Sequence, residues 1–412
     1  MSIVRPFKAV RPDPKLADKV AALPYDVMNS NEAREMVKDN PYSFLFVDKA
    51  EISLDPSIDL YDAKVYEKAA SNLKQMISDK VFIQDEKPCL YIYRLTMNGR
   101  PQTGIVGCTS IDEYEEGKIK KHEHTRADKE IDRIKHVDIT NAHTGPIFLS
   151  YRAKAEINAA VDKWVKEHEA AYNFVADDDV RHEAWVVDCA NTIAKIQGAF
   201  AEVPALYIAD GHHRNASAVK VGLKRREANP NYDKEAEFNF YLSVIFPDDQ
   251  LYIMDYNRVV KDLNGLSDDE FMSKVKEKFD VTDSNDGIPK KLHTFGMYLN
   301  KKWYALTAKP ELIIDDPIEA LDVSILQKQL LFPILGIDDP RTNKRIDFVG
   351  GIRGLKELER RVDSGEMKVA FAMFPTSMDE LLAVADAGEV MPPKSTWFEP
   401  KLRSGMFVHL LD

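Results

Sequence analysis

The segment from Ala205 to about Glu227 constrains the fold most strongly. Its first five residues, Ala205-Leu206-Tyr207-Ile208-Ala209, predict a short buried strand, and a helix is predicted from about His212 to Glu227. Only Asp210 and Gly211 separate the two elements. Together with further alternating strand and helix patterns, this unit predicts an α+β (mixed α/β) protein with a mixed sheet.

The start of that helix is a predicted anion-binding site. Helix N-termini present unpaired N–H groups and the positive end of the helix dipole. Gly211 lets the backbone approach a ligand closely, and His212, His213 and Arg214 add donor side chains. Asp210 either caps the helix or holds a magnesium ion beside bound phosphates.

A capped helix with two solvent-facing histidines is the alternative interpretation of these residues. Cationic side chains at a helix N-terminus oppose the helix dipole, so a purely solvent-exposed position without a function explains them poorly. A zinc site is also disfavoured, because adjacent histidines rarely face one metal ion and lack the HExxH spacing.

A second polar cluster, residues 121–126, has the sequence KHEHTR. A carboxylate such as Glu123 among so many cations should be ionised, and it could accept a hydroxyl proton if a substrate desolvates it. A solvated charged loop is the alternative. The candidate ligands from this cluster and its continuation are His122, Arg126, Lys129 and Arg133, with Asp132 beside them.

Two further segments are candidates for pocket lining. Residues 141–146 precede a predicted strand and include Thr144, although a turn is the simpler interpretation. Residues 392–396 could clamp an anion with Lys394 and Ser395, or form a rigid loop held by Trp397 and Phe398. Lys401 and Arg403 lie close to this segment in the sequence.

Hydrophobic periodicity indicates the remaining elements and three regions. The pair Asn98-Gly99 predicts a β-hairpin, and Asn300 marks a second one. The regions are a catalytic core (1–265), a small α+β insertion (266–323) and a C-terminal segment returning to the core (324–412). Predicted helices cover 31–38, 61–79, 156–169, 192–200, 269–279 and 325–331; predicted strands cover 89–97, 102–111, 147–151, 238–246, 295–299 and 303–306, with another starting at 185.

Bulk properties narrow the function. A net charge of -12 argues against general attraction to nucleic acid or acidic membranes. Three widely spaced cysteines suit a reducing compartment, and no secretory signal or membrane-length apolar run is evident, so a cytoplasmic location is expected. The GxxxxGK[ST] loop, the GxGxxG fingerprint and the protein-kinase motifs are missing from the sequence.

The order of motifs resembles one bacterial and archaeal family that was long classed as a domain of unknown function. These motifs are Leu23-Pro24-Tyr25-Asp26-Val27, Lys121-His122-Glu123-His124-Thr125, Thr144-Gly145-Pro146-Ile147-Phe148, Ala209 to Arg214 and Met391 to Thr396. The Asp210-Gly211-His212-His213-Arg214 motif is also similar to that of SerK-type free serine kinases. That second resemblance implies a nucleotide-binding core of the ParB/sulfiredoxin type.

The resemblance implies transfer of a nucleotide's terminal phosphate to free L-serine or a similar hydroxyl compound. It implies that Asp210 to Arg214 hold the phosphates of ATP or ADP and Mg²⁺, with Asp210 as the metal ligand and His212 in the catalytic group. Glu123 is our candidate base, chosen for its setting. His122 and Arg126 are expected at the phosphates. Expected substrate ligands are Lys129, Arg133, Thr144, Lys394 and Ser395.

The expected partners are therefore a nucleotide and a small molecule, without nucleic acid or membrane; a homodimer is compatible with them. Two other functions stay open at this point. A non-catalytic nucleotide-binding switch of the ParB type would bind nucleotide without forming an acceptor-dependent product. A phosphohydrolase would release phosphate without any acceptor.

Overall fold

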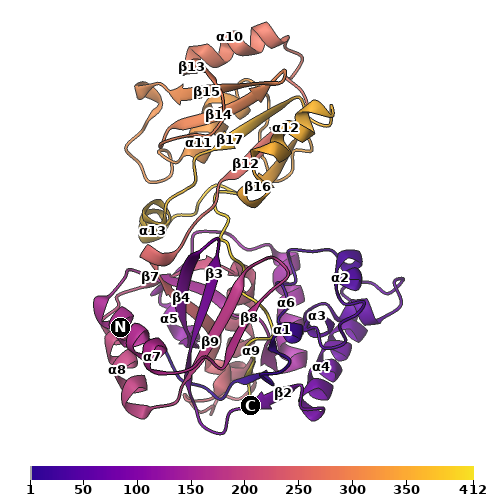
Figure 1. The fold of residues 1–412 in the computed structure, drawn as a ribbon, viewed down its shortest axis with the longest axis vertical. Coiled ribbons are helices and arrows are strands. Elements are labelled where there is room, and N and C mark those ends of the chain that lie inside the picture. Colours follow the sequence, from indigo (N-terminus) through magenta and orange to yellow (C-terminus); the bar gives the residue numbers. More distant parts are fainter. Residues whose placement is uncertain (1) are drawn as a thin grey trace. The chain divides into compact units, whose positions relative to one another are not determined.

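The computed structural model describes residues 2–412, which form two compact units (Figure 1). The first comprises Met1–Leu251 and Pro400–Asp412, and the second comprises Tyr252–Glu399. The second unit is therefore larger than the predicted insertion at 266–323. Only the last residues of the predicted C-terminal segment belong to the first unit. The sequence boundary was misplaced because strands on both sides of the insertion join its sheet.

The first unit is built on a mixed eight-stranded sheet in the order β5-β10-β7-β11-β4-β3-β9-β8. The pairs β10–β5 and β11–β7 are parallel, and the other neighbours are antiparallel. Two short pairs, β1–β2 and β6–β18, complete the strands described for this unit. The strands are β1 (Val10–Pro12), β2 (Phe82–Gln84), β3 (Leu90–Met97), β4 (Arg100–Ser110), β5 (Ile119–Lys120), β6 (Ala142–His143), β7 (Ile147–Tyr151), β8 (Tyr172–Val175), β9 (Arg181–Val187), β10 (Leu206–Asp210), β11 (Phe240–Pro247) and β18 (His409–Leu410).

Helices of the first unit supply most of the remaining core. Apolar side chains of α7, α8 and α9 pack in one cluster with β3, β4, β7, β9, β10 and β11. A second cluster joins the N-terminal helices to α4. The helices are α1 (Ala17–Val20), α2 (Ser30–Met36), α3 (Leu45–Asp48), α4 (Ala63–Ser78), α5 (Ile111–Glu115), α6 (Ala127–Thr140), α7 (Ala155–Glu167), α8 (Ala190–Ala201) and α9 (His212–Ala228).

The charged segment after residue 120 corrects one sequence interpretation. It is not a loop throughout, because α6 begins at Ala127 and continues to Thr140. Its buried face is largely polar, with Glu130, Asp132, Arg133 and His136 inside the protein. Apolar periodicity cannot reveal a helix whose buried side chains are charged and paired.

The second unit contains a six-stranded antiparallel sheet in the order β13-β15-β14-β17-β12-β16. The predicted hairpin around Asn300 is confirmed as β14 and β15. The predicted helix at 325–331 is split, since α11 ends at Leu326 and a π-helical turn follows. The elements are β12 (Tyr256–Val260), α10 (Asp268–Lys278), β13 (Phe279–Ser284), β14 (Thr294–Leu299), β15 (Lys302–Ala308), α11 (Asp322–Leu326), β16 (Ile346–Gly350), α12 (Leu355–Asp363), β17 (Val369–Met373) and α13 (Met378–Asp386).

The expected mixed α+β class is thus confirmed, with a mixed sheet in one unit and an antiparallel sheet in the other. Among residues 2–412, we find no helix with the length and apolar character needed to cross a membrane.

Candidate functional site

Two helices of the first unit, α6 and α9, begin at the same place. The backbone N–H of Arg126 donates to Nε2 of His213 at 3.0 Å. One turn further along both helices, Ser217 Oγ donates to the carbonyl of Glu130 at 3.1 Å. The residue numbers of both partners increase from the first contact to the second, so the two helices run parallel. The positive ends of two helix dipoles therefore meet beside residues 121–126.

Neither helix start has a side-chain cap. The N-cap residues are Arg126 for α6 and Gly211 for α9, and neither supplies a capping hydrogen bond. Gly211 has a φ of 90°, a left-handed conformation that glycine adopts without steric cost. Helix N-termini of this kind present backbone N–H groups that can bind an anion.

Asp210 is held at the end of β10 by two partners. Its Oδ1 accepts from the backbone N–H of Gly211 at 2.8 Å, and its Oδ2 lies 3.1 Å from Nζ of Lys401. Burial alone would raise the pKa of Asp210, but the charges of Lys401 and Arg214 outweigh it and hold the pKa below its ordinary value. Asp210 is therefore an ionised carboxylate, and its hydrogen bond goes to its neighbour instead of capping α9.

These surroundings do not fit a magnesium site built by the protein. Mg²⁺ is usually bound by one or two carboxylates together with waters and substrate phosphates. Here both oxygens of Asp210 already have partners, one of them an ammonium group. The described chain also has no group of three or more His, Cys, Asp or Glu side chains placed to hold a metal. The structure thus gives no support for Asp210 as a metal ligand.

The guanidinium of Arg214 lies close to two glycines, Gly211 and Gly145. Its Nη1 donates to the carbonyl of Pro146 at 2.6 Å, while its buried Nε has no hydrogen-bond partner within residues 2–412. A Cβ added to Gly211 would lie 3.1 Å from Nε and Nη2 of Arg214, and one added to Gly145 would lie 3.5 Å from Nη1. A side chain at Gly211 would therefore crowd the guanidinium, whereas one at Gly145 would make an ordinary contact with it.

Three predicted residues meet near the start of α9. The rings of His122 and His212 are both buried and meet edge to face, with centroids 4.6 Å apart. Burial lowers the pKa of His122 to about 4 and that of His212 well below its ordinary value. Oε2 of Glu123 lies 3.5 Å from Nδ1 of His212, and the Glu123 side chain is 54% exposed. Both histidines are neutral at pH 7, beside a carboxylate that solvent can reach.

The side chains of Arg126 and Lys129 are directed to other partners. Arg126 forms an exposed ion pair with Asp128 at 2.8 Å. Nζ of Lys129 lies 3.3 Å from the hydroxyl of Tyr61. Their predicted roles at phosphate or substrate would require both side chains to leave these partners.

A small cavity of about 20 Å³ lies beside Arg214. By volume it holds about one water molecule. Arg133 is buried there, paired with Asp132 at 2.8 Å and placed over the Tyr25 ring at 4.1 Å. Thr144 Oγ1 donates to Oδ1 of Asp48 at 2.7 Å. The lining residues are Tyr25, Asp48, Arg133, His136, Val137, His143, Thr144, Gly145, Ile147 and Arg214.

The structure therefore brings Arg133, Thr144 and Arg214 to one cavity. The sequence analysis did not select Asp48 and His143, which also line it, and it noted Lys401 only as a neighbour of residues 392–396. Tyr25 belongs to a motif that carried the family resemblance, and His143 lies within the candidate segment 141–146, but nothing local to Asp48 marked that residue. Lys394 and Ser395 belong to the second unit, where Arg258 donates to the Lys394 carbonyl and Ser395 donates to that of Pro392.

Comparison with known proteins identifies the family. A family model described as "Protein of unknown function (DUF1015)" matches residues 4–324. The chain belongs to this family. No curated protein matches the sequence of this DUF1015 member.

Three solved structures resemble this chain at low sequence identity. A free serine kinase in complex with AMP is 16% identical, with a TM-score of 0.33 and coverage of 73% of this chain and 91% of that one. A free serine kinase variant in complex with ADP is 17% identical, with a TM-score of 0.33 and coverage of 73% and 92%. C-terminally truncated SbnI from Staphylococcus aureus is 12% identical, with a TM-score of 0.38 and coverage of 73% and 85%. Likeness at this level carries no conclusion about the activity of this chain.

Proposed function

We propose that the first unit is a nucleotide-dependent small-molecule kinase that phosphorylates free L-serine or a similar hydroxyl compound. The observation that carries this proposal is the meeting of two uncapped helix N-termini, one of which has Arg214 in its first turn, where Arg214 also lines a small cavity together with Arg133. The motif resemblance at Asp210 to Arg214 agrees with it and also suggests a ParB/sulfiredoxin-like core.

The phosphate side of the proposed site is the start of α9. Backbone donors near Gly211, the guanidinium of Arg214 and the ammonium of Lys401 concentrate positive charge there in an otherwise acidic protein. Phosphoryl transfer depends mainly on positioning and on neutralising charge that spreads over the transferred group. A corner with two helix dipoles and fixed cations suits that task.

The substrate side is the cavity next to Arg214. It combines the guanidiniums of Arg133 and Arg214 with the carboxylate of Asp48, so it offers partners for both charges of an amino acid. Thr144 holds one oxygen of Asp48 in place. Because the present cavity has room for about one water, ligand binding has to widen it.

Glu123 is the proposed base. In the reaction, the substrate hydroxyl oxygen bonds to the terminal phosphorus and the bond from that phosphorus to the nucleotide oxygen breaks. The leaving nucleotide keeps the electron pair, and the hydroxyl proton passes to the Glu123 carboxylate. Neutral His212 beside Glu123 would hold that carboxylate in position. In this proposal Mg²⁺ binds together with the nucleotide, whose phosphates supply its oxygen ligands.

The experiment is incubation of the protein with MgATP or MgADP, with and without L-serine, followed by detection of O-phosphoserine. We expect O-phosphoserine from wild type and from Glu115→Gln, a control at an exposed glutamate of α5. In Glu123→Gln the product should fall by at least about a hundredfold, as expected for loss of a general base. No phosphorylated product with either nucleotide across the hydroxy amino acids would rule out the proposal, and phosphate release without an acceptor would indicate a phosphohydrolase.

A further inference from the structure

Two buried histidines from distant parts of the chain meet in the first unit. His143 in β6 and His409 in β18 are register partners of an antiparallel pair. Their Nδ1 atoms lie 3.2 Å apart, within hydrogen-bond distance. A hydrogen bond between two neutral imidazoles requires one nitrogen to carry the proton and the other to accept it. The direction of this bond follows from the other neighbours of His409.

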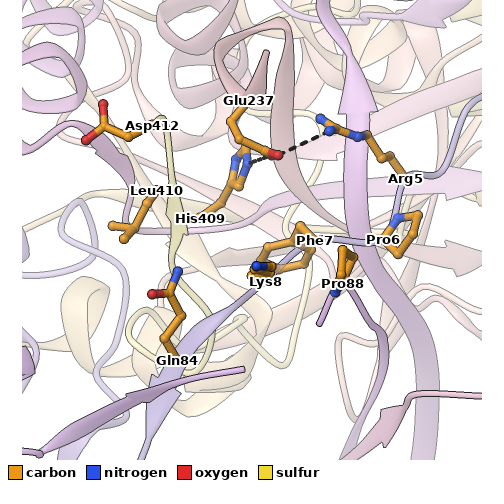
Figure 2. Close-up of a pocket in the computed structure, with 10 residues that line it drawn as sticks. All are labelled: Arg5, Pro6, Phe7, Lys8, Gln84, Pro88, Glu237, His409, Leu410 and Asp412. Atoms are coloured by element: carbon orange, nitrogen blue, oxygen red, sulfur yellow. Dashed lines mark hydrogen bonds and ion pairs between the residues drawn. The ribbon is translucent and has the colours of Figure 1, made fainter. Parts of the chain in front are cut away.

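Glu237 sets the proton position on His409. Its carboxylate lies between His409 and Arg5 along one side of a pocket of about 360 Å³ (Figure 2). Oε2 of Glu237 is 2.7 Å from Nε2 of His409, and Oε1 accepts from Nη2 of Arg5 at 3.1 Å. Burial would raise the pKa of Glu237, but the contacts with His409 and Arg5 lower it overall. An ionised carboxylate only accepts hydrogen bonds, so Nε2 of His409 carries a proton.

The positions of the protons on His409 and His143 then follow in turn. Burial lowers the pKa of His409, which keeps the ring neutral at pH 7 and leaves its Nδ1 without a proton. Nδ1 of His143 must therefore be the donor in the contact between the two rings. Burial also lowers the pKa of His143 far below its ordinary value, so that ring is neutral as well. Nε2 of His143 is left as an unprotonated acceptor.

That acceptor has no hydrogen-bond partner in the part of the chain that the structure describes. His143 is 5% exposed and lines the cavity that Arg133, Thr144 and Arg214 also line. A buried polar atom without a partner is costly, and such atoms in native proteins are usually satisfied by a water or a ligand. The histidine is thus fixed in one tautomer beside the proposed substrate cavity.

We propose that Nε2 of His143 binds the substrate by accepting a hydrogen bond from its ammonium group, beside the Asp48 carboxylate that lines the same cavity. This inference rests on the proposed kinase function and deepens it, because it adds a specificity contact for the amino group of a hydroxy amino acid. His143 is a binding residue in this account, while Glu237 and His409 are positioning residues that act through it.

The test is ¹⁵N NMR of the full chain labelled at histidine, since protonated and unprotonated ring nitrogens have well-separated chemical shifts. His143→Gln assigns the signals. We expect an unprotonated Nε2 at His143 in the free protein. Adding L-serine should shift that signal, whereas 3-hydroxypropanoate, which lacks the amino group, should leave it in place. Glu237→Gln should allow both tautomers, and Glu235→Gln, at a neighbouring exposed carboxylate, should not.

Three results would overturn the inference: a protonated Nε2 at His143, bound L-serine that leaves its signal unmoved, or an equal shift with 3-hydroxypropanoate. If L-serine does not bind at all, the proposed function fails for serine. The tautomer then decides the inference on its own, because a protonated Nε2 contradicts it and an unprotonated Nε2 supports it.

Discussion

The backbone N–H of Arg126 donates a hydrogen bond to Nε2 of His213, and this contact joins the start of α6 to the start of α9. His213 therefore serves as an acceptor in this structure. The sequence had suggested it as a phosphate donor. Because burial lowers its pKa, the ring stays neutral and keeps the lone pair that the Arg126 amide needs. A side chain of α9 thus helps to fix where residues 121–126, including Glu123, enter α6.

Replacing His213 should loosen that loop. We expect His213→Phe to lower the free energy of unfolding by about 0.5–1.5 kcal/mol, the usual contribution of one hydrogen bond. Hydrogen exchange at the Arg126 amide should become faster. His213→Gln offers an acceptor of similar reach and should restore part of the protection. Unchanged exchange at Arg126 in His213→Phe would show that this contact does not hold the loop.

Buried His122 should make the protein less stable in mild acid. Its pKa is lowered from about 6.5 to about 4 in the folded state, so only the unfolded chain gains a proton in this interval. The stabilisation is complete above pH 6.5 and is lost as the pH falls toward 4, by about 1.4 kcal/mol per pH unit.

The measurement is the free energy of unfolding between pH 7 and pH 4.5. In His122→Gln, its slope against pH should be shallower than in wild type by up to one proton. The matched control is His124→Gln at an exposed position, which should keep the wild-type slope. Identical slopes for wild type and His122→Gln would contradict a neutral, buried His122.

Alanine substitutions at Gly211 and at Gly117 distinguish the effect of backbone strain from the effect of contact with Arg214. Both have positive φ, 90° and 74°, so an alanine at either position should cost about 1–2 kcal/mol in backbone strain. A Cβ at Gly117 meets no atom within 4 Å, whereas one at Gly211 comes within 3.1 Å of the Arg214 guanidinium. We therefore expect similar losses of stability by chemical denaturation but weaker nucleotide binding only in Gly211→Ala. Equal nucleotide affinities in the two variants would show that Arg214 is not part of the nucleotide-binding site.

Local patterns predicted many elements of the fold. The apolar spacing of α4, the Asn98-Gly99 turn between β3 and β4, and the short apolar run of β10 all formed as expected. The sheet that joins β12, β16 and β17 to the predicted hairpin at Asn300 was not predicted. Those strands pair with partners 70 to 113 positions away in the chain, and no local signal specifies such partners.

Site residues could be predicted where charged residues and glycine lie close together in the sequence. Asp210 to Arg214 and Glu123 stood out because their residue types are unusual at a helix start and in a charged loop. Asp48 was not selected, and His143 and Lys401 were noted only as part of, or close to, candidate segments. The role of each depends on a partner far away in the chain, namely Thr144, His409 and Asp210 respectively. Pairing between distant residues is a property of the fold and leaves little trace in local sequence.

The central claim is that residues Gly211 to Arg214 bind the phosphates of a nucleotide, and calorimetric titration with ADP tests it most directly. Wild type should bind ADP, and Arg214→Gln should bind at least about tenfold more weakly, since loss of a charged hydrogen bond costs about 1.5–3 kcal/mol. Arg181→Gln, at an exposed arginine of β9, is the control and should bind as wild type does. Equal ADP affinity in Arg214→Gln and wild type, with both proteins folded, would contradict the account.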